Sequence, residues 1–172
     1  MTRLENLLGA QSLELAGRLL DADVGGSGMA ASERAALVTL LAHPDRTVRW
    51  LGDVLGLTSS GGTRLVERLV DAGWVTRTAG TDARQRRLDL TRTGRARARA
   101  VLKARQAVIG EVVEVLTEQE RRQLEALLDK MVVGLAATRL PALHVCRLCD
   151  RAACSSGGRE CPLRHTMGTA DD

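Results

Sequence analysis

The apolar residues near the start of the chain recur at the spacing of an α-helix over residues 3–21. Because positions three or four residues apart share one face of a helix, this pattern predicts an amphipathic helix. The leucines of its apolar face are Leu4, Leu7, Leu8, Leu15 and Leu19. The glycine-rich stretch ADVGGSGM follows, and we expect it to end the helix.

Three shorter helices are predicted between residues 32 and 73. Each begins after a Ser or Thr that can accept a hydrogen bond from the first turn, and each stops at a glycine or before a proline. The predicted helices run from Ser32 to just before Pro44, from Thr47 to Gly56, and from Thr58 to Gly73. The last two are joined by GLT and have the proportions of a helix-turn-helix.

A short hairpin is predicted after these helices. Residues 74–78 and 86–91 alternate between apolar and polar positions, which is typical of strands with Val75, Leu88 and Leu90 on the inward face. The polar loop AGTDARQ lies between them. Two strands around a basic loop, directly after a helix-turn-helix, form a wing.

Two more helices are predicted after the wing. The pattern is helical from Thr93 to Leu116, and Thr117 with Glu120 then forms a capping box at the start of the next helix. We expect Pro141 to end this last helix. Its apolar stripe is close to a coiled-coil seam, and we interpret it as a dimer interface rather than intramolecular core. The stripe consists of Leu124, Leu128, Met131 and Leu135, widened by Leu127.

The composition changes this picture in two ways. The chain has no Tyr or Phe and only two Trp, so its core consists mainly of Leu, Val and Ala, which favours packed helices. The net charge is +4, and nearly all of the positive charge is Arg, which permits a polyanionic partner; a GC-rich coding bias is an alternative cause. The sequence shows neither a signal peptide nor an 18-residue apolar run, so we expect a cytoplasmic protein without membrane contact.

The stretch from Ser32 to Gly94 resembles the MarR family of winged helix-turn-helix regulators. LGLTSSGGTRLVERLVDAGWV and DARQRRLDLTRTG carry the resemblance, which extends over roughly residues 5–137. It implies a mainly α fold with a small β-wing, with a DNA-binding domain at 30–94 and dimerisation helices at 1–24 and 95–140. It also implies a homodimer, usually a repressor, that binds a palindromic operator in double-stranded DNA. A small-molecule effector would bind between the dimerisation helices and the winged domain.

The candidate DNA-contacting residues lie on the predicted recognition helix and on the wing. Arg64 can make a bidentate contact to guanine, or it can contact a phosphate or face solvent. Gly61 and Gly62 are unusual inside a helix; they would allow a close approach to the groove or leave the helix frayed until DNA binds. Of the wing residues, Arg84 is expected in a minor groove. The full set is Ser59, Ser60, Thr63, Arg64, Arg68, Asp82, Arg84, Arg86 and Arg87.

All four cysteines lie in residues 141–172, which we interpret as a metal-binding tail. The spacing Cys146-x2-Cys149-x4-Cys154-x6-Cys161 allows one tetrahedral Zn²⁺ site, whose metal would supply the folding energy because no apolar core is evident there. An iron–sulfur cluster is the alternative, since Pro162 follows the last cysteine as in ferredoxins. A metal-free thiol switch is the third possibility.

Three further assignments depend on this tail and on the histidines. We expect His144 and His165 to be solvated or to support the ligands, and His43 to be a charge at a helix C-terminus. The enzyme alternative is a thiol oxidoreductase that uses Cys146 and Cys149, but no thioredoxin-like βαβ context or other catalytic motif accompanies them. A DNA-associated protein that assembles partners through its tail is the remaining hypothesis.

Overall fold

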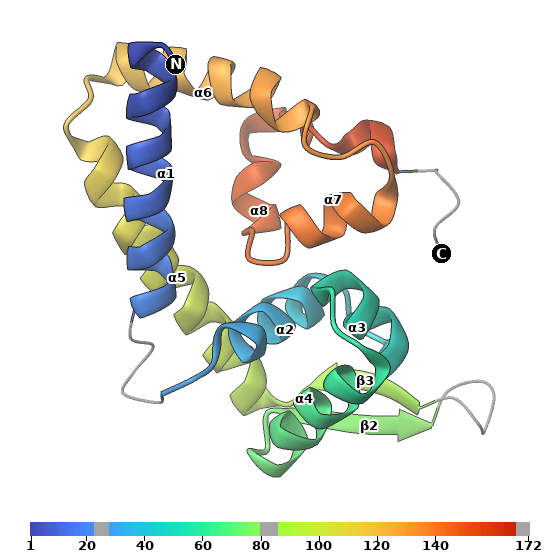
Figure 1. The fold of residues 1–172 in the computed structure, drawn as a ribbon. Helices are drawn as coiled ribbons and strands as arrows, with labels where there is room; N and C mark the ends of the chain where they lie inside the picture. The colour runs from blue at the N-terminus through green and yellow to red at the C-terminus, as the bar shows by residue number, and fades with distance from the viewer. Residues whose placement is uncertain (23–27, 80–85, 168–172) are drawn as a thin grey trace.

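The chain folds into a winged helix-turn-helix domain, a long helical arm and a small helical segment that lies between them (Figure 1). The computed structural model describes residues 1–22, 28–79 and 86–167. In chain order the elements are α1 (Arg3–Asp21), α2 (Ala31–Ala42), β1 (Arg46–Thr47), α3 (Val48–Leu55), α4 (Ser59–Asp71), β2 (Val75–Ala79), β3 (Arg86–Leu90), α5 (Arg92–Glu114), α6 (Glu118–Val133), α7 (Arg139–Val145), α8 (Arg151–Cys154) and the 3-10 turns η1 (Ser156–Gly158) and η2 (Arg164–Thr166). No helix of the described residues is apolar over a length that could cross a bilayer.

Side-chain caps start most of the helices where the sequence predicts them. Thr47 Oγ1 accepts from the amide of Trp50 at 3.1 Å, and Thr58 Oγ1 accepts from the amide of Gly61 at 3.1 Å. The capping box that starts α6 is also present. These caps satisfy amides that have no partner within the helix, so they set the helix boundaries locally.

The two expected strands pair as an antiparallel hairpin, and Val75, Leu88 and Leu90 are buried, as predicted. The sheet has a third strand that the sequence analysis missed. The two residues of β1 pair with β3, which gives the strand order β1-β3-β2. The sheet therefore holds the start of α3 against the wing.

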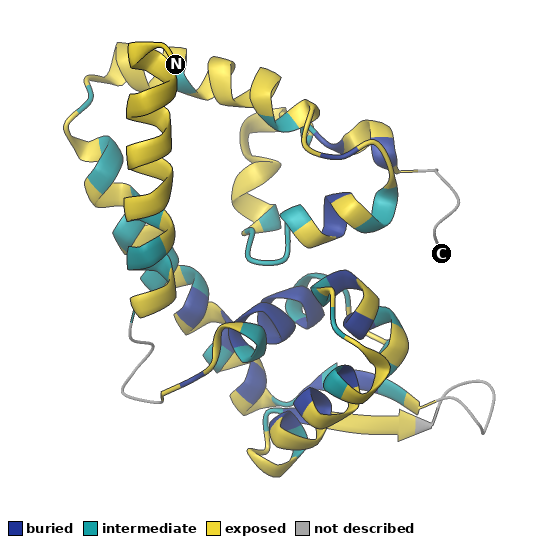
Figure 2. Cartoon of the chain, viewed as in Figure 1, coloured by how far each residue is buried: buried dark blue, intermediate teal, exposed yellow. Residues whose placement is uncertain are grey.

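The core of the molecule lies in the winged domain (Figure 2). Its most deeply buried side chains come from α2, α3, α4, β3 and the first half of α5, since Ala98 and Val101 belong to the same cluster. By contrast, α1 and α6 bury no residue, and their apolar side chains include Leu4, which is 74% exposed. The arm therefore presents apolar surface that this single chain leaves open.

Two predicted helix boundaries are wrong. Ser32 lies inside α2, which begins two residues after Met29 because the Glu33 carboxylate accepts from the amide of Ala30 at 3.1 Å. Pro141 does not end a helix but lies in the first turn of α7, where a missing amide costs nothing. Leu135 of the predicted stripe lies beyond the end of α6.

The cysteine segment has an apolar cluster of its own, contrary to the sequence-based expectation. Ala136, Ala142 and Leu163 are buried together, and Val132 of α6 packs against them. The cluster joins the end of the arm to both ends of the segment. Metal is therefore not the sole source of folding energy for this segment.

Arg34 connects the arm to the winged domain. Its side chain is buried in α2, and Nη1 donates to the carbonyl of Ala22 at 2.9 Å and more weakly to that of Leu19 at 3.4 Å. A cation at these carbonyls satisfies acceptors that the end of α1 leaves without intrahelical partners. Arg18 and Glu111 add an ion pair between α1 and α5.

Gly94 lies where α5 passes closest to the wing. A Cβ atom at this position would meet the carbonyl oxygen of Trp74 at 1.9 Å. Thr91 fixes the start of α5 to the same stretch of backbone. Its amide donates to the carbonyl of Trp74 at 3.0 Å, and its Oγ1 donates to the carbonyl of Gly73 at 2.7 Å. The start of α5 thus rests directly on the backbone of the hairpin.

We expect Gly94→Ala to lower the free energy of unfolding by about 1–3 kcal/mol, because backbone must move to admit the methyl group. Urea denaturation followed by circular dichroism, at one fixed protein concentration, measures this. Gly110→Ala in the same helix is the control, since nothing lies within 4 Å of its Cβ position. It should leave stability unchanged or raise it by up to about 1 kcal/mol. Equal stability of the Gly94→Ala variant and the wild type would contradict the packing argument.

Candidate functional site

The first turn of α4 presents polar side chains to solvent. Ser59, Ser60, Thr63 and Arg64 are all exposed, whereas Leu65, Val66 and Leu69 on the other side of the helix are buried in the core. Thr63 Oγ1 donates to the carbonyl of Ser59 at 3.0 Å, and Ser60 Oγ lies 3.3 Å from Thr58 Oγ1. The predicted recognition residues therefore share one accessible surface at the helix N-terminus.

The two unusual glycines of α4 have a structural explanation within the protein. Gly62 is buried, and a Cβ there would lie 3.5 Å from the Cα of Gly52 in α3. The two helices of the helix-turn-helix thus approach closely through a pair of glycines. Gly62 belongs to the helix without any ligand present, so the helix is not frayed at this position. Gly61 is half-buried beside the Thr58 side chain.

The remaining predicted contact residues are differently placed. Arg68 forms an ion pair with Glu33 of α2 at 2.9 Å, so its guanidinium is engaged within the protein. Arg86 is exposed on β3, and Arg87 Nη1 donates to the carbonyl of Asp45 at 3.2 Å. Asp82 and Arg84 lie outside the described residues, so their predicted roles stay predictions.

Two exposed arginines beside this surface were not singled out from the sequence. Arg49 of α3 has a side chain that is 92% exposed and pairs only distantly with Asp53, at 3.9 Å. It lines one groove together with Ser59 and Thr63 of α4. The sequence contains a signal for the exposure of Arg49. Leu51 and Val54 are apolar positions on one face of this helix, and their spacing puts Arg49 on the opposite face. Arg77 is exposed on β2.

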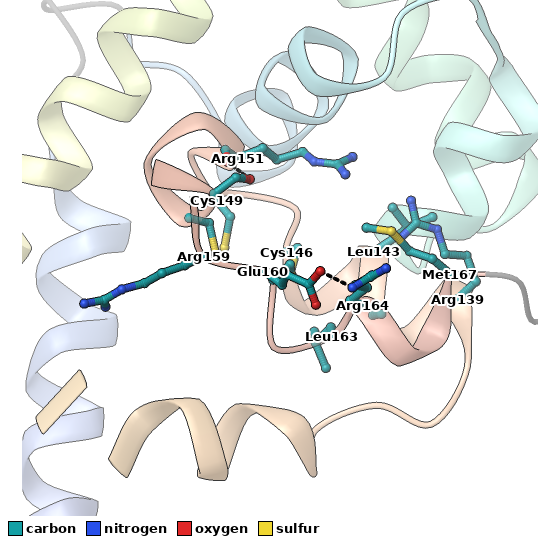
Figure 3. A pocket seen from close by; sticks show the side chains of 14 residues that line it. Arg139, Leu143, Cys146, Cys149, Arg151, Arg159, Glu160, Leu163, Arg164 and Met167 are labelled. Atoms are coloured by element: carbon teal, nitrogen blue, oxygen red, sulfur yellow. Dashed lines mark hydrogen bonds and ion pairs between the residues drawn. The ribbon is translucent and has the colours of Figure 1, made fainter. Parts of the chain in front are cut away.

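The four cysteines face one another across the C-terminal segment. All four line a single cavity of about 210 Å³ (Figure 3). They interact as two hydrogen-bonded pairs, Cys146 with Cys149 and Cys154 with Cys161, and all four are free thiols. The fold therefore brings together the residues that the spacing suggested.

The first pair shares a proton unequally. The hydrogen bond from Cys146 lowers the pKa of Cys149 to about 6 against the effect of burial, and Arg105 and Arg147 contribute further. The same hydrogen bond and burial raise the pKa of Cys146. The pair consequently holds one thiolate near neutral pH, at Cys149, with Cys146 as the donor.

The loop between Cys146 and Cys149 rests on the winged domain. Thr39, buried in α2, donates through Oγ1 to the carbonyl of Arg147 at 3.3 Å. Leu148 packs against the core of that domain. One turn earlier, His144 Nδ1 lies 2.9 Å from the carbonyl of Val54, near the end of α3. The C-x2-C loop is thus held against both helices that precede the recognition helix.

A fourth contact follows the loop. Arg151 Nη1 lies 2.8 Å from His43 Nε2, so the guanidinium donates and the imidazole accepts. Burial, together with the positive charges of Arg151, Arg139 and Arg46, lowers the pKa of His43 to about 4. His43 is therefore neutral at physiological pH, and the predicted helix-terminal charge is wrong. His165 Nε2 lies 3.0 Å from the carbonyl of Ala136, so it supports the apolar cluster of the segment.

The other side of the segment faces the arm. Arg159 pairs with Glu125 of α6. Cys154 lines a cavity that also borders Glu125 and Asp129 of α6. In Figure 1 the segment accordingly lies between α6 on one side and α2 and α3 on the other. It links the arm to the DNA-binding domain independently of α5.

The crevice between the arm and the winged domain holds little free space. Its cavity is about 50 Å³, and Leu148 from the cysteine loop forms part of its lining beside Leu19, Arg34 and Val101. Pockets that bind small organic ligands usually have about 300–1,000 Å³. The cysteine loop thus occupies the region in which the family resemblance would place an effector.

Comparison with known proteins identifies the class that this geometry defines. Residues 27–85 match the model of the MarR family. The fold is similar to that of wild-type MarR from Escherichia coli, with 26% identity over 76% of this chain and 98% of that chain and a TM-score of 0.62. A MarR family protein from Bacillus stearothermophilus has 28% identity over 74% and 89% of the two chains, with a TM-score of 0.66.

A third similar structure contains a ligand. The MarR family protein Rv2887 from Mycobacterium tuberculosis, solved with salicylic acid, has 25% identity over 76% of this chain and 97% of that chain, with a TM-score of 0.59. A search of the curated proteins by sequence found no match. The chain thus has a winged helix-turn-helix fold similar to that of MarR-family transcriptional regulators, and the match to the family model lies in its DNA-binding domain. About a quarter of the chain lies outside each of the three structural matches.

We expect the melting temperature to fall as the pH is lowered from about 6.5 toward 4. His43 has its pKa lowered to about 4 in the folded state, so the unfolded chain binds more protons in this window and gains stability relative to the native state. Thermal unfolding followed by circular dichroism at several pH values measures this. His43→Gln, which stays neutral, should flatten the pH dependence, whereas His165→Gln should leave it in place. An unchanged slope for His43→Gln would remove His43 as its cause.

Proposed function

We propose that the protein is a sequence-specific DNA-binding transcriptional regulator that acts as a homodimer, most simply as a repressor. The observation that carries the proposal is the exposed polar first turn of α4, whose apolar face is fixed in the core. Such a turn fits the major groove, where Ser, Thr and Arg side chains can contact base edges and phosphates. Arg49 lines a groove with Ser59 and Thr63, and Arg77 and Arg86 add exposed positive charge on the hairpin.

The exposed apolar surface of the arm supports the proposed dimer. In the described chain α1 and α6 bury no residue, although both carry an apolar stripe. Leu127 and Met131 of α6 are 56% and 50% exposed. A second copy would cover these side chains through a symmetric interface. Two recognition helices about 34 Å apart would then bind half-sites one helical turn apart.

The tail supplies the proposed input of the regulator. We infer that its four thiols, which line one cavity, would bind Zn²⁺ or an iron–sulfur cluster. The loop that carries two of them rests on α2 and α3. Binding or loss of the metal would then change the position of the recognition helix. We favour this input over an organic effector because the crevice beside Leu148 offers only about 50 Å³.

Selection from a random duplex library, followed by binding titrations at several salt concentrations, tests DNA binding. For the selected site we expect Arg64→Ala to weaken binding about 5- to 150-fold, equivalent to about 1–3 kcal/mol for a lost base contact. If Arg64 contacts a phosphate, the salt slope also falls by about 1. Arg3→Ala, at the far end of the arm, is the matched control and should bind like the wild type. A selection without an enriched site would refute the proposed function.

Replacing Leu127 and Met131 together with arginine is expected to convert the dimer into monomers at micromolar concentration. The two side chains lie one turn apart on the exposed face of α6, and charges there would oppose burial by the second copy. Sedimentation velocity measures the mass. Arg122→Glu on the opposite face should leave the dimer intact. A wild-type chain that sediments as a monomer would exclude the dimer altogether.

A further inference from the structure

The cavity that the four cysteines help to line is larger than a single metal ion. The cavity that they line measures about 210 Å³, whereas one water molecule takes up about 30 Å³. Thiolates that share one zinc ion stand about 3.8 Å apart, because each Zn–S bond is about 2.3 Å long. Within residues 1–22, 28–79 and 86–167, no three Cys, His, Asp or Glu side chains are placed to hold one metal ion. The volume of the cavity that all four cysteines line leaves room for a body of several atoms.

The walls of this cavity suit a thiolate-bound centre. Leu143, Leu163 and Met167 provide apolar surface, which shields a cluster from solvent. Four arginines line the same cavity, and their positive charge would compensate the negative charge of the thiolates. These are Arg139, Arg151, Arg159 and Arg164. Cys161 is followed by Pro162, as the last cysteine of bacterial ferredoxin motifs is, although the other spacings differ.

We propose that Cys146, Cys149, Cys154 and Cys161 bind an iron–sulfur cluster in this cavity, rather than a single zinc ion. The inference rests on the proposed function and deepens it by naming the metal centre. One cluster would join the Cys146–Cys149 loop, which contacts the winged domain, to Cys154 and Cys161, which lie on the side of α6. The two pairs would then be bonded to one rigid centre.

The test is the metal content of the full chain purified without oxygen. We expect iron and acid-labile sulfide in about equal amounts, between about two and four of each per chain, with a broad visible absorption. The metal-free chain should regain this absorption when ferrous iron and sulfide are added under anaerobic conditions. About one zinc per chain with no iron, and no cluster on reconstitution, would overturn the proposal. Four free thiols that take up neither metal would overturn it as well.

The iron content of Cys154→Ser and of Cys161→Ser should each be lower than that of the wild type by a factor of about ten or more. Ser156→Ala is the matched control in the same turn, and it should keep its iron. Circular dichroism of each variant separates loss of the cluster from loss of the fold. Full iron content in both folded cysteine variants would contradict ligation by these residues.

The metal measurement uses no DNA, so its outcome is separate from that of the DNA-binding test. A chain that selects a DNA site but carries no cluster would leave the regulator in place and refute the cluster. A chain that carries a cluster but selects no site would refute the proposed function and leave the cluster in place.

Discussion

The contact of Gly94 with the hairpin backbone determines how the two halves of the molecule are joined. A side chain there would collide with the carbonyl of Trp74, so α5 begins directly against the wing. Its first half contributes Ala98 and Val101 to the core of the winged domain, and its second half continues into the arm. Because one continuous helix serves both parts, the direction in which α5 starts also sets the direction of the arm.

The cysteine segment provides a second connection between the same two halves. On one side Arg147 and His144 contact α2 and α3, and on the other side Arg159 pairs with Glu125 of α6. A segment that contacts both the arm and the winged domain restricts how freely the two can move relative to each other. A change in the segment would therefore act on the angle between arm and DNA-binding domain rather than on the surface of α4 itself.

This arrangement suggests how one fold can receive different inputs. The similar structure of Rv2887 was solved with salicylic acid. Here Leu148 lines the crevice between arm and winged domain, and about 50 Å³ remains open. Leu148 belongs to the loop between Cys146 and Cys149, so this loop fills part of the crevice. The binding chemistry would then reside in the thiols beside the crevice.

Much of the fold could be predicted from the sequence because it depends on local contacts. The caps at Thr47, Thr58 and Thr117 need only a side chain and an amide three residues later, and the inward positions of the hairpin follow from a period of two. The four cysteines were predicted as one set from their spacing alone. Their gathering in one cavity supports that grouping, although the bound species stays a proposal.

Three features that the sequence did not indicate depend on residues far apart in the chain. The strand β1 exists because Arg46 pairs with Leu88, and Gly62 is buried because Gly52 of another helix lies against it. The cysteine loop contacts Thr39, more than 100 positions away. Periodicity and capping describe single elements, so the sequence by itself determined the helices, the two strands of the hairpin and the grouping of the four cysteines in one segment. Which surfaces those elements share was decided only when the core closed, because burial couples residues without regard to their separation along the chain.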